Sequence, residues 1–370
     1  MKSLDLYILR QCLIPLALIL TVTTAVVWMT QTLQRIEIIV EYGQSLGIFA
    51  FLSVLIIPSL LAVIIPFAVF GAVMYALYRL HSDSEIAVMF AAGVSRQRMA
   101  APVLLITLIG AAVTLYVNID LMPRSYRVLK QYIADIRADF ATTLFRSGEF
   151  SDILDGFTVY VEETQANGQL VGLLINDFRN GDNPETYMAE QAVFRETEKG
   201  PTLFLRNGNI QRVDPKSGDV NIIRFEEWAV NIESFSNPAG PLQLELTERY
   251  LGELFNPDLT KPYDRVNASK LIAEGHNRLA GPIYTFAYVM IGLFALIGGS
   301  YSRQGYLLRI AMACGVVFFV RVCGFVVQGL AQNTNAYWLI YAIPVTAIVL
   351  ATIALFAPPN FNRTSTKAVA

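Results

Sequence analysis

A short segment at residues 82–93 carries the side chains with the clearest chemical use. Ser82 and Glu85 have the spacing of a capping box, in which each side chain accepts a hydrogen bond from a backbone N–H that the first helical turn leaves unpaired. Gly93 can end the same helix, because glycine takes the left-handed conformation that closes many helices. The segment predicts a short amphipathic helix whose candidate contact residues are Ser84, Glu85, Ile86, Met89 and Gly93.

Two interpretations of this helix stay open from its residues. It could lie flat on lipid headgroups with its apolar side in the interface, as many amphipathic helices do. It could instead be a coupling helix that inserts its apolar side and Glu85 into a motor subunit in the cytoplasm. In the second interpretation the helix carries force into the membrane.

A stripe of polar residues runs along the first apolar stretch of the chain. Thr21, Thr24, Trp28, Gln31 and Arg35 recur at spacings of three and four residues, which places them on one face of a helix. Polar groups that face lipid are costly, so this face should meet another helix or a wet cavity, and it is a candidate substrate path. Arg35 could equally be an ordinary anchor whose charge reaches the membrane surface.

The fifth apolar stretch has polar positions of its own, Cys314, Arg321, Gly324, Gln328 and Gln332. Arg321 lies about 18 Å along a helix from Arg309, at about 1.5 Å per residue, which is too deep for an easy reach to water. Two roles are open for Arg321. It could make a hydrogen bond to a neighbouring helix, or it could contact an anionic, partly apolar cargo, since guanidinium binds phosphate through paired donors. Arg321 and Gln328 therefore join the candidate substrate path.

Other chemistry finds little support in the sequence. The chain has no GxxxxGK[ST] loop to hold nucleotide phosphates, and its two histidines, His81 and His276, fall on opposite sides of the expected membrane. A net charge of −2 argues against a nucleic-acid partner. The three cysteines lie in or beside apolar segments and offer neither a disulfide framework nor a zinc site. We expect a non-catalytic chain without a metal or cofactor of its own.

The composition indicates that a membrane positions these residues. Hydrophobic residues make up 54% of the chain and charged residues 16%, which leaves too few polar side chains to cover a soluble globule of 370 residues. A membrane-spanning helix needs roughly 20 mostly apolar residues. Six stretches qualify: 13–34, 48–78, 99–119, 279–302, 307–331 and 336–357. The polar cluster at 332–335 predicts a tight turn between the last two.

Basic residues predict the orientation, because cytoplasmic loops carry an excess of Lys and Arg. With both termini in the cytoplasm, the short outer segments hold only Arg35. The inner segments hold Lys2, Arg10, Arg79, Arg96, Arg98, Arg303, Arg309, Arg363 and Lys367. We therefore expect the long polar interval after the third span to lie outside, in the periplasm of a bacterial cell.

That interval predicts an inserted all-β domain. It begins with a helical pattern at Leu129, Tyr132, Ile133, Ile136 and Phe140, which should continue the third span. Short β-branched and aromatic runs follow at 158–161, 170–175, 202–205, 222–225 and 228–232, with turn signals at 167–168, 180–181, 207–208 and 215–218. Many short strands suggest a sandwich or jelly roll. We expect spans one to three with the coupling helix in 1–123, the β domain with flanking helices in 124–278, and spans four to six in 279–370.

With these features in place, the chain resembles the lipopolysaccharide-export permease family, LptF/LptG, and its F-type members more than its G-type members. The resemblance covers essentially the whole chain. Its most specific parts are residues 83–89 followed by 92–95, and residues 273–282 at the start of the fourth span. Residues 7–10 and 31–35 also fit.

The resemblance implies a transporter built from two such permeases, this chain and a G-type partner, with two copies of a cytoplasmic ATPase (LptB-type) that binds ATP and Mg²⁺. In that family lipopolysaccharide enters a cavity between the permeases from the outer leaflet of the inner membrane. Closure of the cavity pushes it into the jelly roll and onto a bridge of an anchored protein (LptC-type) and a soluble one (LptA-type). Glu85 and its neighbours would dock the ATPase, and Arg35 would meet lipid A phosphates.

Two other functions remain open from the sequence. A membrane-anchored periplasmic receptor or assembly scaffold would use the helices only as anchors and would need no ATPase. An ion-coupled transporter would need buried acidic residues and an inverted repeat, and the expected spans show neither.

Overall fold

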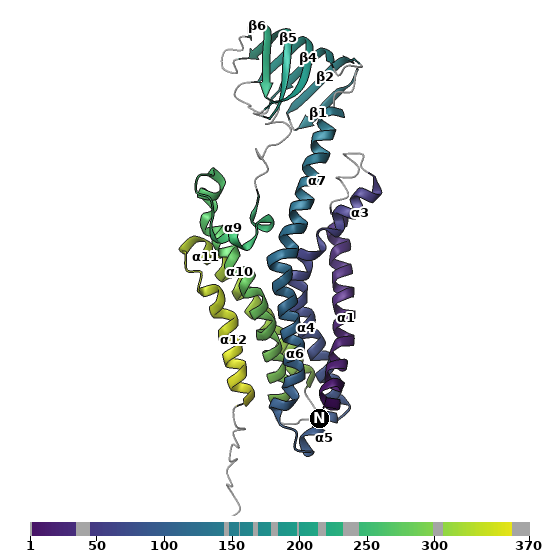
Figure 1. Ribbon diagram of the computed structural model, residues 1–370, viewed down its shortest axis with the longest axis vertical. Helices are drawn as coiled ribbons and strands as arrows, with labels where there is room; N and C mark the ends of the chain where they lie inside the picture. Colours follow the sequence, from purple (N-terminus) through teal and green to yellow (C-terminus); the bar gives the residue numbers. More distant parts are fainter. Residues whose placement is uncertain are drawn as a thin grey trace, which may run out of the picture. The chain divides into compact units, whose positions relative to one another are not determined.

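The computed structural model describes residues 2–34, 45–143, 148–154, 156–165, 169–178, 184–197, 200–213, 220–231, 244–298 and 306–356. These residues belong to two compact units. The first combines Met1–Leu129 with Leu244–Ala370, and the second is Lys130–Gln243. The first unit is helical and the second holds the strands (Figure 1).

Among the described residues, six helical segments are long and apolar enough to cross a membrane, as the hydropathy pattern predicts. In chain order the elements of the helical unit are α1 (Lys2–Leu33), α3 (Leu46–Val54), α4 (Ile57–Ser82), α5 (Glu85–Ala91), α6 (Arg96–Tyr116), the π-helical turn η1 (Val117–Leu121), the start of α7 (Met122–Thr143), the 3-10 turn η2 (Leu246–Glu248), α9 (Leu251–Phe255), α10 (Pro262–Leu293), the π-helical turn η3 (Phe294–Gly298), α11 (Tyr306–Thr334) and α12 (Leu339–Phe356). In two of the six segments a short π-helical turn continues the helix: η1 joins α6 to α7, and η3 extends α10.

The start of the fourth span differs from the hydropathy pattern, whereas the third span is as expected. The third span does continue through η1 into α7, as expected from its helical spacing. The helix of the fourth span begins at Pro262 and not at residue 279. Hydropathy misses the first half of α10 because that half carries charged and polar residues that are buried against protein, among them Asp264 and Arg278.

α10 is the centre of the helical unit. Two-thirds (67%) of its most apolar window is buried within the chain, against 6% for α1, so α10 is enclosed by its neighbours and α1 is not. The shared core includes Val73 and Leu77 of α4, Val103 of α6 and Ala287 of α10, all fully buried. α5 and the N-terminus lie at one end of the helices and α9 at the other, and these ends are called the α5 end and the α9 end (Figure 1).

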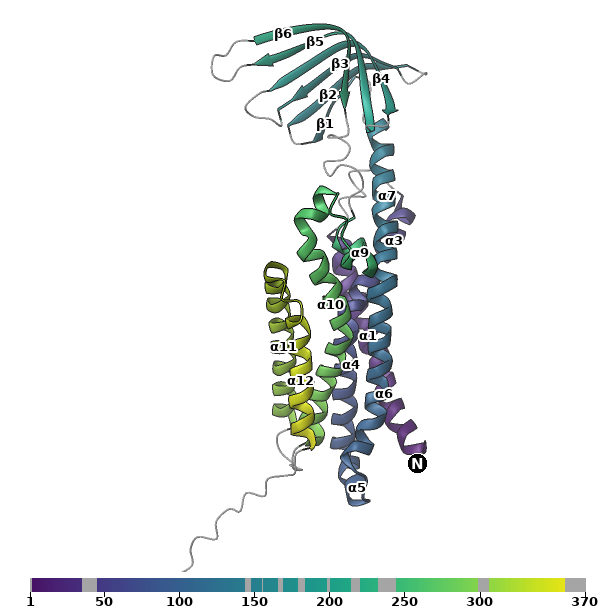
Figure 2. The same ribbon diagram turned by 60° about the vertical axis from the view of Figure 1, so that its left-hand side comes forward.

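The turn predicted at residues 332–335 is present. α11 ends at Thr334, Asn335 has a positive φ of 56°, and α12 begins at Leu339. A left-handed residue lets the chain reverse within a few residues, and asparagine tolerates that conformation better than most side chains. The two helices therefore pack side by side as an antiparallel pair (Figure 2).

The described residues of the second unit form one six-stranded antiparallel sheet with its strands in sequence order. The strands are β1 (Phe150–Leu154), β2 (Phe157–Thr164), β3 (Gln169–Asp177), β4 (Glu185–Thr197), β5 (Gly200–Val213) and β6 (Val220–Asn231). The prediction of an inserted all-β domain is confirmed. The described strands follow one another as hairpins, whereas the jelly roll that we expected has crossovers between two sheets.

Two strand predictions are corrected. The runs at 222–225 and 228–232 belong to a single strand, β6, which ends at Asn231. Asn207 and Gly208 do not form a turn but lie inside β5, where Asn207 has a positive φ of 51°. The turn signals at 167–168, 180–181 and 215–218 fall outside the described residues.

The irregularity at Asn207 belongs to a crease that crosses the sheet. Gly172 also has a positive φ, 63°, and the register places both Gly172 and Asn207 opposite Glu190 of β4. Leu170 and Leu173 are each only 3% exposed, although residues three apart on a regular strand point to opposite faces. The left-handed residue reverses the alternation, so apolar side chains on both sides of the crease reach the same core. The sheet is correspondingly curved (Figure 2).

Candidate functional site

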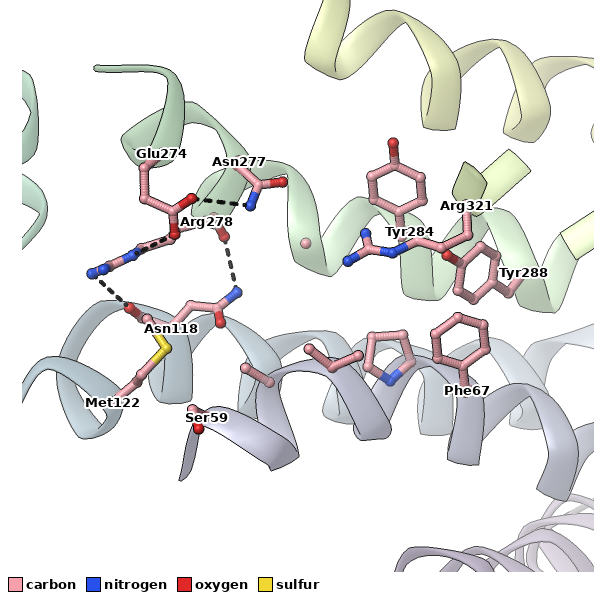
Figure 3. Close-up of a pocket in the computed structure, with 14 residues that line it drawn as sticks. Ser59, Phe67, Asn118, Met122, Glu274, Asn277, Arg278, Tyr284, Tyr288 and Arg321 are labelled. Carbon is pink, nitrogen blue, oxygen red and sulfur yellow. Dashed lines mark hydrogen bonds and ion pairs between the residues drawn. The ribbon is translucent and has the colours of Figure 1, made fainter. Parts of the chain in front are cut away.

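A cavity of about 130 Å³ lies within the helical unit, at the level of the middle of α10 (Figure 3). Four segments line it: α4, the η1–α7 junction, α10 and α11. The lining residues are Ser59, Ala62, Val63, Pro66, Phe67, Asn118, Met122, Glu274, Asn277, Arg278, Gly281, Tyr284, Tyr288 and Arg321. The lining is thus partly aromatic and partly charged, which is unusual inside a membrane-spanning bundle.

One wall of the cavity is an ion pair within α10. Arg278 Nε donates to Glu274 Oε1 at 3.2 Å, and the arginine is only 2% exposed. Its two other nitrogens donate to the backbone oxygens of Arg249, at 2.7 Å, and Leu246, at 2.6 Å. Asn277 donates to Glu274 Oε2 at 3.4 Å. Buried charges are tolerated when they are paired and fully hydrogen-bonded, and this pair meets that condition.

Pro282 explains why Asn118 lies beside the pair. A proline has no N–H, so the carbonyl of Arg278, four residues earlier, lacks its helical donor. Asn118 Nδ2 supplies a replacement at 3.2 Å. Asn118 belongs to the π-helical turn η1, and such turns interrupt helices frequently at functional sites. Gly281 permits the approach, since a Cβ there would lie 2.8 Å from Asn118 Nδ2.

Arg321 closes the cavity from α11. Its guanidinium lies 4.1 Å from the centre of the Phe325 ring and 5.2 Å from that of Tyr284. Among the described residues, Arg321 Nε is buried without a hydrogen-bond partner and no carboxylate pairs with the side chain. Glu274 is the nearby acid that lines the same cavity, and it is already paired with Arg278. The cavity therefore holds one cation more than it holds anions.

The other polar positions of the fifth span meet α10 unevenly. Gln328 Nε2 donates to Glu274 Oε2 at 3.3 Å, which joins α11 to the buried pair. Gly324 allows the two helices to touch, because a Cβ there would lie 2.2 Å from the hydroxyl of Tyr284. Cys314 is exposed and lies away from the cavity lining.

The structure does not bring the polar stripe of the first span to this cavity. Thr24, Trp28 and Gln31 are half-buried on α1, and none of them lines the cavity. Trp28 Nε1 donates to the backbone oxygen of Ser53 at 2.9 Å, so this part of the stripe faces α3. Arg35 lies outside the described residues.

α5 forms at the expected place with a different start. Ser82 ends α4, and the first turn of α5 follows Ser84, whose backbone is left-handed with φ 59°. The capping box of Ser82 and Glu85 is therefore wrong, because the two helices are joined by a turn too tight to form it. The end is as predicted: Gly93 has φ 84°, and Val94 N–H donates to the Met89 carbonyl at 3.0 Å.

The side chains of α5 divide between core and surface. Ile86 is 1% exposed and belongs to the helical core. Met89 packs against that core from a half-buried position. Glu85 accepts a hydrogen bond from the Tyr7 hydroxyl at 2.9 Å, whereas Val88 is 67% exposed. α5 therefore presents an apolar and acidic surface while one side is fixed to the bundle.

A second group of charges fastens the α9 end. Arg249 binds both oxygens of buried Asp264, one of them at 2.7 Å, and this contact raises the pKa of the Arg249 guanidinium. Arg127 pairs with Glu253 and lies over the Tyr250 ring. Burial alone would raise the pKa of Glu253, but the hydrogen bond from Arg127 and the neighbouring charges hold it below its usual value. The two ion pairs join α9 and the turn before it to α7 and α10.

Sequence reasoning missed the cavity residues Asn118, Glu274, Arg278, Tyr284 and Tyr288. A signal for two of them was available, since Glu274 and Arg278 fall within the stretch 273–282 and have the i, i+4 spacing of a helical ion pair. The expected start of the span at residue 279 left both in the water-exposed region. The apparent lack of buried acidic residues, used against an ion-coupled transporter, is also incorrect for α10, because Asp264 is 2% exposed and the Glu274 side chain is 17% exposed.

The fold and the cavity define a class: a multi-pass helical membrane protein with an inserted β domain and a charged cavity among its helices. Residues 6–358 match the family described as lipopolysaccharide export system permease LptF/LptG. The match spans nearly the whole chain, including both units, and the chain belongs to this family.

The chain is also similar over most of its length to a protein from Rickettsia prowazekii (strain Madrid E). It is 25% identical over 350 residues, which cover 93% of this chain and 95% of the relative. Its name describes it as an uncharacterized protein. The relative therefore supports a common architecture over the full length and adds nothing about activity.

Proposed function

We propose that this chain is one permease subunit of an ATP-driven lipopolysaccharide exporter in the cell inner membrane. In this proposal both termini and α5 lie in the cytoplasm and the β domain lies in the periplasm. The chain extracts lipopolysaccharide from the outer leaflet and passes it to the β domain. From there the glycolipid moves along a periplasmic bridge toward the outer membrane.

The observation that carries the proposal is the excess positive charge of the cavity. Arg321 is flanked by aromatic rings and lacks a carboxylate partner among the described residues, while Glu274 is neutralised by Arg278. An unpaired cation inside a membrane is costly, and an anionic ligand removes that cost. A phosphorylated glycolipid provides anionic and apolar groups in one molecule. Helices that only anchored a scaffold would gain nothing from such a cavity.

The remaining features fit an energy-driven extraction. Each methylene that leaves a lipid environment for water costs about 0.8 kcal/mol, so a glycolipid with several acyl chains needs both work and shelter. α5 offers Glu85 and exposed Val88 to an ATPase, which would bind ATP and Mg²⁺ itself. The curved sheet gathers buried Val161, Leu173 and Leu205 into one apolar core that could receive acyl chains.

The proposal assigns partners to the exposed helices. α1 has only 6% of its apolar window buried and α11 has 22%, so both are available to a second, homologous permease. Two copies of the ATPase and a bridge of membrane-anchored and soluble β proteins complete the assembly. Purification of the chain from its own membrane should recover the ATPase and the second permease together.

Site-specific crosslinking tests the cargo role of Arg321. A photoreactive residue at position 321 should crosslink lipopolysaccharide in reconstituted vesicles. The same residue at Phe319, which is 67% exposed on nearly the opposite face of α11, should crosslink mainly bulk phospholipid. Arg321→Ala should lower export by about tenfold while the protein stays folded, and Arg321→Lys should retain part of the activity because it keeps the charge.

One pattern of results would contradict the proposal. If position 321 never crosslinks lipopolysaccharide and Arg321→Ala lowers thermal stability, then Arg321 serves the packing of α11 against α10. Recovery of the chain without an ATPase, with normal function of Glu85→Lys, would favour an anchored scaffold.

A further inference from the structure

A chain of three side chains joins α1 to α5 at the α5 end. Gln11 Nε2 donates to the Tyr7 phenol oxygen at 3.2 Å, and the Tyr7 hydroxyl donates to Glu85 Oε1 at 2.9 Å. Gln11 and Tyr7 are one turn apart on α1, while Glu85 begins α5, 78 residues away in the sequence. This contact is long-range, so its purpose is not local helix formation.

The order of the donors fixes the direction of the hydroxyl. Because the Tyr7 oxygen receives the Gln11 amide, its own hydrogen is directed to the carboxylate, and successive hydrogen bonds of this kind strengthen one another. A carboxylate has two oxygens and several acceptor positions. Tyr7 occupies Oε1, and within the described residues Oε2 of Glu85 has no hydrogen-bond or ion-pair partner. Tyr7 thus binds Oε1 of Glu85 and leaves Oε2 available to a partner.

The backbone on both sides of the Tyr7–Glu85 contact is held in place by its neighbours. Ile86, next to Glu85, is 1% exposed and shares the helical core with Ile8, next to Tyr7. Arg98 of α6 pairs with Asp5 of α1 at 3.0 Å, which fixes the same turn of α1 from another side. A glutamate side chain has several rotamers, and among the described residues the hydrogen bond from Tyr7 favours one of them.

We propose that Tyr7 is a positioning residue for the contact between α5 and the ATPase. It holds the Glu85 carboxylate so that Oε2 faces outward to a cationic side chain, Arg or Lys, of that partner. The inference rests on the proposed function and extends it to a residue of the first span. Tyr7 also links Glu85 directly to α1, so motion of α5 reaches the first span without passing through α4.

The test measures binding of the ATPase that co-purifies with the chain to the solubilised full-length permease complex. Glu85→Gln should weaken binding about tenfold and flatten its dependence on salt, because it removes an ion pair. Tyr7→Phe deletes only the hydroxyl and should weaken binding about fivefold. The double variant should bind no more weakly than Glu85→Gln alone, since Tyr7 acts through Glu85.

Tyr78→Phe is the matched control, because it deletes an exposed hydroxyl near the same end, on α4, and should leave binding unchanged. Gln11→Leu should produce a smaller loss than Tyr7→Phe, and thermal unfolding of all variants should match wild type. These two readouts separate positioning from a purely structural role.

The outcomes distinguish the two proposals. If Glu85→Gln weakens binding and Tyr7→Phe does not, the positioning role is wrong and the coupling role of α5 stands. If the two effects add in the double variant, Tyr7 acts independently of Glu85, and the inference is again overturned. If Glu85→Gln itself has no effect, the proposed ATPase contact at Glu85 fails first.

Discussion

At the scale of single residues, the defining feature is the way in which charge is tolerated inside the bundle. Arg278 satisfies its hydrogen-bond donors with Glu274 and with backbone carbonyls that come from the segment before α10. Arg321 has aromatic rings and no such partners among the described residues. The two arginines would look alike in a hydropathy plot, yet Arg278 is fully hydrogen-bonded within the chain and Arg321 faces the cavity, where we propose that it binds an anionic ligand.

Removal of Arg278 should expose its structural role. Arg278→Met leaves the Glu274 carboxylate without its cationic partner and two backbone carbonyls without donors, so we expect a loss of about 3–5 kcal/mol in stability. Thermal unfolding in detergent measures it. Adding Glu274→Gln should recover part of the loss because the uncompensated charge disappears. Arg265→Met, at an exposed position of the same helix, should change stability by no more than about 0.5 kcal/mol. An Arg278→Met variant as stable as wild type would refute this account.

At the scale of elements, irregular segments allow side-chain contacts that straight helices and strands could not make. Pro282 releases a carbonyl of α10, and η1 places Asn118 where it can donate to it. In the sheet, left-handed residues at Gly172 and Asn207 turn the strands so that one apolar core forms. Both irregularities place a side chain where regular geometry would not allow it.

The contact between α10 and α11 should depend on Gly324. A methyl group there would lie 2.2 Å from the hydroxyl of Tyr284, which is itself buried and cannot move freely. Gly324→Ala should therefore displace α11, cost about 1–3 kcal/mol and disturb the Arg321 site. Gly329→Ala, on the same helix with open space around it, should be neutral or slightly stabilising. Equal thermal unfolding of the two variants would contradict the close approach.

At the scale of the whole molecule, two units divide the proposed task. The helical unit holds the charged cavity and α5, and the second unit holds the apolar core of the curved sheet. α10 is enclosed by its neighbours, whereas α1 and α11 keep most of their apolar surface exposed within the chain. Apolar helix faces of this kind are covered by lipid or by another membrane protein, and in the proposed function the second permease covers part of them.

The orientation of the whole chain can be measured by labelling. In a background with Cys12, Cys314 and Cys323 replaced by Ala, Val266→Cys at the start of α10 should react with a membrane-impermeant thiol reagent in intact spheroplasts. Val88→Cys on α5 should react only after the membrane is opened. Both positions are strongly exposed, at 79% and 67%, so access across the membrane decides the result. The reverse pattern would contradict the predicted orientation.

The sequence by itself determined the class of the molecule. Six apolar stretches, an interval with strand-like periodicity and the turn at Asn335 are set by composition and local spacing, which act through solvation and backbone preference near each residue. Gly93 ended its helix as predicted for the same reason. The stretches 83–89 and 273–282 also carried the family resemblance that the match over residues 6–358 bears out.

Only the tertiary structure decided which polar groups are satisfied and which are available. Hydropathy places Glu274 and Arg278 in the water-exposed region, but α10 begins at Pro262 and is enclosed by protein. The Tyr7 contact to Glu85 and the Asn118 contact to α10 join residues 78 and 160 positions apart. Pairing between distant side chains depends on how the helices pack, and packing energy is shared among many residues, so no local pattern in the sequence encodes it.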